Sequence, residues 1–126
     1  AASRVHFAGL DDVIATADVI SLHVPLVDST RNLFDARRIA SMKRGAVLIN
    51  SARGGVVDEV ALAAALKGGA LGGAAIDVFG SEPLPASEHF KDCPNLLLTP
   101  HIAGLSAESN ERVSFLIADK VLEALQ

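Results

Sequence analysis

The sequence predicts an α/β protein in which helices wrap a parallel β-sheet. Short aliphatic runs alternate with helical patterns along its 126 residues, and no repeat interrupts the alternation. Half of the residues are hydrophobic but Trp and Tyr are absent, so Val, Ile, Leu and Ala must fill the core. Such aliphatic strands are typical of parallel sheets that are buried on both faces. The alternation of strands and helices therefore favours one domain of this class.

The first half of the chain is expected to contain three strands and two helices. Asp11 and Asp12 suit the positive N-terminal end of a helix, Pro25 ends a strand, and Gly45 stops a helix. In chain order we expect a short strand at 5–7, a helix at 10–17, a strand at 19–24, a helix at 35–43 and a strand at 46–50.

The second half is expected to contain two further strands and two helices. Asp58 is a suitable N-cap for a helix through Lys67, which Gly68 stops, and strands follow within GAAIDVF and NLLLTP. From Ser106 onward a long amphipathic helix with one buried stripe is expected. Its stripe consists of apolar residues at helical spacing, namely Val113, Leu116, Ile117, Val121, Ala124 and Leu125.

Composition argues against several classes of partner. The net charge is −4 and basic residues cluster only in pairs, at 37–38 and 43–44, so neither nucleic acid nor a membrane is an expected partner. The single Cys93 cannot form an internal disulfide, and neither a signal-peptide pattern nor an apolar run of roughly 20 residues is present, so the cytoplasm is the expected compartment. The sequence contains no metal-ligand spacing, so no metal site is expected. His6 and His89 are expected at the surface.

The residues that directly follow the predicted strands are the candidates for chemistry, because ligands of open parallel sheets bind beyond the carboxyl ends of the strands. An arginine, two carboxylates and a histidine are therefore expected to converge on one edge of the sheet. The residues in these positions are Pro25, then Ser51, Ala52 and Arg53, then Asp77 with Glu82 beyond it, and then Pro100 and His101.

Each of these side chains also has an ordinary structural interpretation. Arg53 could be a solvated loop arginine that pairs with Asp58 or Glu59. His101 could be a turn histidine and Glu82 an exposed loop glutamate, while the carboxylate after GAAI could cap a turn. Local sequence alone leaves these interpretations open.

Four motifs in one order carry a family resemblance: HVPLVDSTRNLF, MKRGAVLINSARGGVVDEVALAAAL, GAAIDVFGSEPLP and NLLLTPHIAG. They closely resemble the nucleotide-binding domain of the D-isomer-specific 2-hydroxyacid dehydrogenases over nearly the whole chain. The resemblance implies a doubly wound, Rossmann-type parallel sheet, present as the later part of a nucleotide-binding domain. It also implies hydride transfer between NAD(P) and a D-2-hydroxy acid/2-oxo acid pair.

The resemblance implies roles for four residues. His101 would be the general acid/base, because an imidazole can accept and return the hydroxyl proton near neutral pH. Glu82 would orient its ring, and Arg53 would bind the substrate carboxylate with its planar fork. Asp77 would lie beside the nicotinamide and hold its carboxamide.

The implied cofactor is NAD, with NADP left open because the residue that would select between them is missing. Arg53, Asp77 and His101 would also contact the cofactor. The other implied cofactor-binding residues are Val24, Pro25, Thr30, Ser51, Ala52, Ala103 and Gly104. Gly54 and Gly55 would let the backbone pass close under cofactor and substrate. No segment has the G-x-G-x-x-G pattern that would hold the pyrophosphate.

The resemblance further implies that residues 1–105 are a partial NAD-binding domain without its first strands and glycine-rich turn. Residues 106–126 would be a long amphipathic helix leading back toward a substrate domain. The full-length protein would be a homodimer acting on a small 2-hydroxy or 2-oxo acid. In a doubly wound fold the strand at 5–7 would lack its neighbours, so it is expected to be frayed, re-paired or completed by a neighbouring molecule. The 126 residues alone are expected neither to bind NAD usefully nor to form a stable monomer.

Two rival functions share the same motifs. Formate dehydrogenases have the same fold, but in their pattern the histidine is partnered by glutamine, so Glu82 argues against that activity. A dinucleotide-sensing transcriptional corepressor would keep the motifs while acting through protein partners. Within the dehydrogenases, the segment TPHIAGLSAESNERVS hints at the phosphoglycerate or sulfolactate branch.

Overall fold

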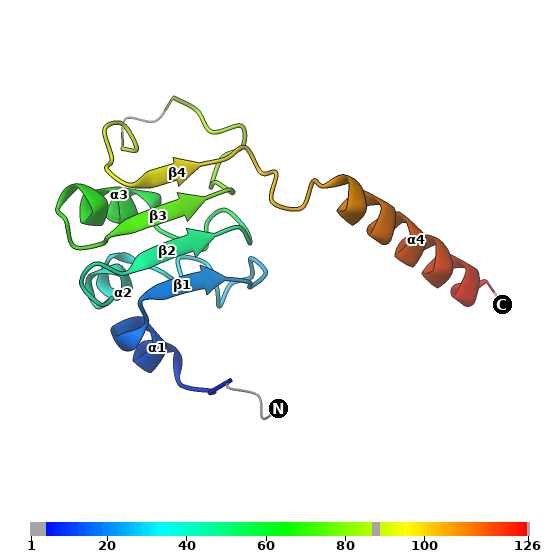
Figure 1. The fold of residues 1–126 in the computed structure, drawn as a ribbon, viewed down its shortest axis with the longest axis horizontal. Coiled ribbons are helices and arrows are strands. Elements are labelled where there is room, and N and C mark those ends of the chain that lie inside the picture. Colours follow the sequence, from blue (N-terminus) through cyan, green and yellow to red (C-terminus); the bar gives the residue numbers. More distant parts are fainter. Residues whose placement is uncertain (1–4, 87–88, 126) are drawn as a thin grey trace.

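Four parallel strands form one sheet in the computed structural model, which describes residues 5–86 and 89–125 (Figure 1). The strands lie side by side in chain order as β1 (Val19–Leu22), β2 (Val47–Asn50), β3 (Gly73–Ile76) and β4 (Leu96–Leu98). Every neighbouring pair is parallel, so the carboxyl ends of all four strands share one edge of the sheet. The predicted α/β class with a parallel sheet is confirmed.

Helices separate most of the strands and begin close to the expected positions. They are α1 (Leu10–Thr16), α2 (Ala36–Ala40), α3 (Glu59–Lys67) and α4 (Ala107–Ala124). Three of them start where a side chain accepts a backbone N–H from three residues further on, as N-cap residues do. These caps are Asp35 for α2, Asp58 for α3 and Ser106 for α4, at 2.8, 3.0 and 3.1 Å.

The core lies mainly on one face of the sheet. Ile20, Leu48 and Ala74 are register partners in β1, β2 and β3, and all three are buried. Leu62 of α3 belongs to the same buried cluster. Successive side chains of a strand point to opposite faces, and Val19, beside Ile20, is 56% exposed. The elements that the structure describes therefore cover one face more fully than the other.

Residues 5–9 adopt no regular secondary structure, so the prediction of a strand at 5–7 is wrong. The side chain of Phe7 is 98% exposed. A strand this short is held by hydrogen bonds to a neighbouring strand, and β1 at this end of the described sheet pairs with β2 alone. Residue type suits a strand here and the outer side of β1 is open, but no strand at 5–7 joins the described sheet, in line with the expectation that this segment would be frayed.

Helix α4 is present where the apolar periodicity predicts a helix, but none of its residues is buried. Val113, Leu116 and Val121 of the expected stripe are each more than half exposed. The helix extends away from the sheet (Figure 1). The expectation of a buried stripe is therefore wrong for the described part of the chain. Amphipathic spacing indicates which face a helix can bury, but not which element covers that face.

No helix within residues 5–86 and 89–125 has both the length and the apolar composition needed to cross a membrane. Within the same ranges, no three His, Cys, Asp or Glu side chains gather so as to hold a metal ion. Cys93 is a free, half-buried thiol whose sulfur lies 3.3 Å from the carbonyl oxygen of His89.

Candidate functional site

Glu82 and His101, from the loops after β3 and β4, meet at the carboxyl edge of the sheet. His101 Nδ1 lies 2.7 Å from Glu82 Oε2, and Glu82 Oε1 accepts the backbone N–H of Phe79 at 2.9 Å. The hydrogen bond from His101, and then that from Phe79, hold the pKa of the Glu82 carboxyl below its usual range. An ionised carboxylate can only accept, so Nδ1 carries the proton of the neutral imidazole. The unprotonated Nε2 remains available.

Asp77, directly after β3, holds the loop that carries His101. Its buried carboxylate accepts the backbone N–H groups of Ile102 and Ala103, both at 2.9 Å, and the hydroxyl of Thr99. Burial alone would raise the pKa of Asp77, but these hydrogen bonds together lower it below the ordinary value of 3.8. The carboxylate therefore stays ionised and fixes the segment on both sides of His101.

The backbone of His101 lies in the left-handed region, with φ 56°. This conformation is unfavourable for a residue with a side chain and persists where surrounding contacts impose it. The contacts here include the hydrogen bond from the His101 N–H to the Asp77 carbonyl at 2.8 Å. The geometry of the histidine thus depends on the residue that follows β3.

Arg53 lies in the loop after β2, which is organised by the buried side chain of Asn50. Asn50 Nδ2 donates to the Arg53 carbonyl at 3.0 Å, and Asn50 Oδ1 accepts the Ala52 N–H at 3.1 Å. Arg53 is exposed, and its Nη1 donates to the Ala52 carbonyl at 2.6 Å. The guanidinium forms no ion pair with any residue that the structure describes.

Arg53 is thus an exposed loop arginine, as the ordinary interpretation has it, but its expected pairing with Asp58 or Glu59 does not occur in the described structure. Asp58 instead caps α3, and Glu59 accepts the backbone N–H of Gly80 at 2.7 Å. Both carboxylates are used within the protein, which leaves the remaining guanidinium donors of Arg53 available to a ligand.

Gly54 joins the Arg53 loop to the loop that carries Glu82. A Cβ atom at position 54 would lie 1.7 Å from the Phe79 carbonyl oxygen, so only glycine allows this approach. Gly55 follows with φ 78°. In the described structure the close approach that Gly54 permits is to the protein's own backbone. It brings the backbone beside Arg53 against the segment that leads to Glu82.

Other predicted cofactor residues are spread along the same edge. Val24, Pro25 and Thr30 follow β1, and the Thr30 hydroxyl fixes their loop by donating to the Pro25 carbonyl at 2.6 Å. Ser51 and Ala52 follow β2. Ala103 and Gly104 follow β4, beyond His101. The strand order β1-β2-β3-β4 therefore places the group after β1 two strands away from Glu82, whereas Arg53, Asp77 and His101 follow the neighbouring strands β2, β3 and β4.

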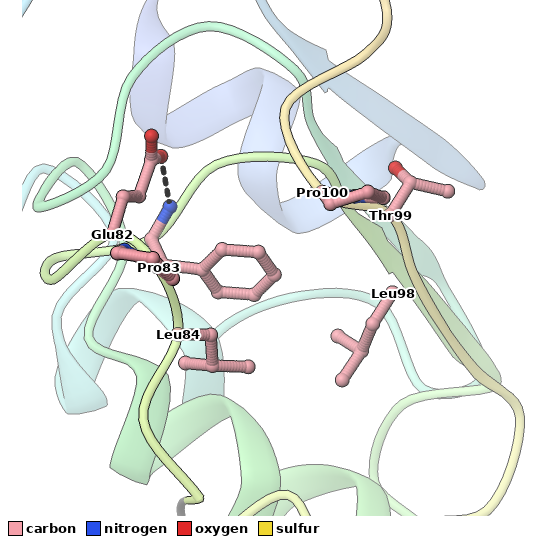
Figure 2. A pocket seen from close by; sticks show the side chains of 7 residues that line it. Glu82, Pro83, Leu84, Leu98, Thr99 and Pro100 are labelled. Atoms are coloured by element: carbon pink, nitrogen blue, oxygen red, sulfur yellow. Dashed lines mark hydrogen bonds between the residues drawn. The ribbon is translucent and has the colours of Figure 1, made fainter.

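A pocket of about 670 Å³ lies between the loops after β3 and β4 (Figure 2). It is lined by Phe79, Glu82, Pro83, Leu84, Leu98, Thr99 and Pro100. In Figure 2, Leu84 and Leu98 face a common space, while the Glu82 carboxylate points away from them toward the Phe79 backbone. An apolar wall therefore adjoins the polar pair of Glu82 and His101.

Two residues that organise the site were missed in the sequence analysis. Asn50 is a buried polar residue at the end of an aliphatic strand, and that unusual position is a signal for a structural hydrogen-bonding role. Glu59 was considered only as a partner for Arg53. Its actual partner, Gly80, lies 21 residues away in the chain, and no local pattern indicates such a contact.

Comparison with known proteins identifies the family to which the chain is similar. Residues 1–103 match the sequence profile of "D-isomer specific 2-hydroxyacid dehydrogenase, NAD binding domain". The chain is 52% identical over 116 residues to (S)-sulfolactate dehydrogenase of Chromohalobacter salexigens, covering 92% of this chain and 38% of that protein. It is 50% identical to D-3-phosphoglycerate dehydrogenase of Haemophilus influenzae, covering 90% of this chain and 29% of that protein.

A solved structure agrees in fold as well as sequence. The structure of D-lactate dehydrogenase from Aquifex aeolicus, complexed with NAD and lactic acid, has a TM-score of 0.80 and 35% identity. The match covers 94% of this chain and 40% of that one. The chain thus spans less than half the length of each of these relatives, and the expected Rossmann-type fold is confirmed. The chain belongs to the D-isomer specific 2-hydroxyacid dehydrogenase family, and residues 1–103 correspond to its NAD binding domain.

Proposed function

We propose that the intact protein transfers a hydride between NAD(P) and a D-2-hydroxy acid/2-oxo acid pair, with Arg53, Glu82 and His101 as its catalytic residues. The observation that carries the proposal is the 2.7 Å contact between His101 Nδ1 and Glu82 Oε2. In this contact Nδ1 of His101 is hydrogen-bonded to Glu82, and Nε2 is left for a ligand at the edge where open parallel sheets bind ligands. Family membership supports the reaction class.

The pair can move one proton in each direction. In oxidation, Nε2 of His101 accepts the hydroxyl proton of the substrate, while the hydrogen on C2 of the substrate leaves as a hydride. Glu82 accepts the hydrogen bond from Nδ1–H, and its negative charge stabilises the imidazolium that results. In reduction, the same imidazolium returns the proton to the carbonyl oxygen. An ionised Glu82, whose pKa is lowered, is suited to this role near neutral pH.

Arg53 supplies recognition of the substrate carboxylate. Its exposed guanidinium has no carboxylate partner within the described residues, and a planar fork can bind a carboxylate through two parallel hydrogen bonds. The Gly54 contact with Phe79 sets the Arg53 backbone beside the loop of Glu82. A 2-hydroxy or 2-oxo acid carries its carboxylate next to the reacting carbon. The side chain that binds the carboxylate and the one that transfers the proton must therefore lie close together.

The donor and acceptor set fits the nicotinamide half of NAD(P). Among the described residues, Asp77 Oδ2 accepts one hydrogen bond, from Ala103, and it retains capacity to accept another from a carboxamide. The nicotinamide ring, when bound, supplies or takes up the hydride. Ser51, Ala52, Ala103 and Gly104 would border that ring, and Val24, Pro25 and Thr30 would lie toward the adenosine. The described loops include no glycine-rich turn that would hold the pyrophosphate.

The proposal extends to organisation of the chain. Residues 1–105 would be the part of the NAD-binding domain that carries the site, and residues 106–126 would lead toward a substrate domain. The exposed apolar residues of α4 support a helix that is covered elsewhere in the intact protein. Homodimer formation and a cytoplasmic location remain predictions, and the substrate would be a small 2-hydroxy acid.

Turnover by the intact protein tests this function. NADH oxidation would be measured with glyoxylate, pyruvate, hydroxypyruvate and 3-phosphohydroxypyruvate, alongside the His101→Ala variant as a control. We expect turnover of at least one acid that His101→Ala nearly abolishes. NADH binding without turnover of any 2-oxo acid would favour the corepressor alternative, which the dehydrogenase names of the relatives do not support.

A further inference from the structure

Two carboxylates hold consecutive backbone N–H groups in the loop after β3. The N–H of Phe79 donates to Glu82 Oε1 at 2.9 Å, and the N–H of Gly80 donates to Glu59 Oε1 at 2.7 Å. Glu59 is the first residue of α3, so it joins this loop to an element that packs in the core. Hydrogen bonds to an ionised acceptor are among the stronger ones in proteins.

The side chain of Glu59 is itself held in place. It is only 18% exposed, and its Oε2 lies 3.5 Å from His89 Nε2, a contact without hydrogen-bond geometry. The His89 ring contacts the Phe90 ring, with centroids 4.3 Å apart, and Phe90 packs edge-on against Phe79. The surface position expected for His89 is therefore wrong, because its ring is half-buried against Phe90 and faces Glu59. This packing limits the rotamers available to Glu59.

The segment that Glu59 holds is shared by both halves of the candidate site. Gly80 lies two residues before Glu82, whose carboxylate must reach His101 Nδ1. Phe79, on its other side, contacts Gly54 beside Arg53. Movement of the Gly80 end of this segment would change the distance from Glu82 to His101, whereas the contact of Phe79 with Gly54 holds the Arg53 side of the segment.

We propose that Glu59 is a positioning residue for the reaction: it fixes the Gly80 backbone so that Glu82 holds His101 in its working orientation. The inference rests on the proposed function, because it assumes that Glu82 and His101 transfer the proton. Gly80 is exposed, so water can replace the lost acceptor when Glu59 is removed. The fold then loses little, whereas the alignment of Glu82 is lost.

Kinetics of the intact protein test the proposal through Glu59→Ala, Glu59→Gln, Glu82→Ala and the double variant Glu59→Ala/Glu82→Ala. Glu59→Ala should lower kcat on the order of 10- to 100-fold, because small misplacements of catalytic groups have effects of this size. KM, NADH affinity and Tm should stay close to wild type. Glu59→Gln keeps an oxygen that can accept the Gly80 N–H, and it should retain most of kcat.

The double variant distinguishes positioning from a general structural role. If Glu59 acts through Glu82, adding Glu59→Ala to Glu82→Ala should lower kcat no further. Multiplicative losses, or wild-type kcat in Glu59→Ala, would overturn the inference while leaving the proposed function intact. Wild-type kcat in Glu82→Ala would instead overturn the proposed pair itself. If Glu59→Ala does not fold, the kcat of Glu59→Gln decides. A kcat close to wild type supports the proposal, and a loss of kcat in Glu59→Gln as large as that in Glu82→Ala contradicts it.

Discussion

The loops at the carboxyl edge of the sheet and helix α4 differ in what holds them. The carboxylate of Asp77 alone accepts three hydrogen bonds from residues 99–103, which follow a different strand, β4. Helix α4 has its own backbone ladder and the cap of Ser106, yet buries no residue. Local signals thus suffice to define where a helix begins, whereas the site exists only when distant segments meet. Changes at the edge should affect chemistry, and changes in α4 should affect only α4 unless another element covers it.

The largest effect is expected for His101→Ala in the intact protein. The variant should lower kcat by about 10² to 10⁴, because it removes the group that transfers the proton. NADH affinity should stay near wild type, since His101 is one of several residues expected to contact the cofactor, whereas it alone is assigned the proton transfer. Steady-state kinetics and a fluorescence titration with NADH measure the two effects. Wild-type kcat across the pH range would show that the assignment of His101 is wrong.

Arg53 should show the next largest effect, and its lysine variant is the informative one. Arg53→Ala should lower kcat/KM on the order of 10- to 100-fold, the equivalent of losing a hydrogen bond to a charged group. Arg53→Lys should not restore it, because a point charge cannot form two parallel hydrogen bonds to a carboxylate. Equal kcat/KM for the Lys and Arg forms would exclude bidentate binding at this position.

Asp77→Asn should lower stability as well as activity, because it replaces an acceptor of three hydrogen bonds with a neutral amide. The loss of folding free energy should be about 1 to 3 kcal/mol at neutral pH. Urea unfolding of the intact protein measures it, with Asp119→Asn on the exposed α4 as a matched control. A loss no larger than that of the control would contradict the anchoring role of Asp77.

The difference in folding stability between wild type and Asp77→Asn should depend on pH, because the pKa of Asp77 is lowered in the folded protein. Its folded-state pKa lies below the ordinary value of 3.8, so the ionised form stabilises the folded protein at pH values above that value. This contribution is lost as the pH falls through the folded-state pKa. The gap in stability between wild type and Asp77→Asn should therefore be constant near neutral pH and shrink below pH 3.8. A gap that widens in acid would reverse the sign of the proposed linkage.

The strands, caps and edge residues were predictable because short patterns encode them. Asp58 and Ser106 are caps by residue type and position, and strand order places Asp77 and His101 at one edge. The contact between Glu59 and Gly80 was not predictable, since it joins α3 to a loop 21 residues later through one side chain. Residue type predicted a strand at 5–7, whereas its absence follows from the expectation, implied by the family resemblance, that the neighbours of this strand are missing.

The smallest effects, and the closest comparison of the two regions, come from two matched caps in the 126-residue chain, compared at a protein concentration at which the sheet is folded. Asp58→Ala and Ser106→Ala each remove a side-chain acceptor at a helix N-terminus, a change that costs about 1 kcal/mol of helix stability. Helix α3 buries Leu62 and Leu66 in the core, so Asp58→Ala should lower the urea midpoint of the whole sheet. Helix α4 has no buried residue, so Ser106→Ala should leave that midpoint unchanged and instead speed amide exchange within α4 alone. Equal shifts of the urea midpoint in both variants would mean that α4 is coupled to the sheet in solution.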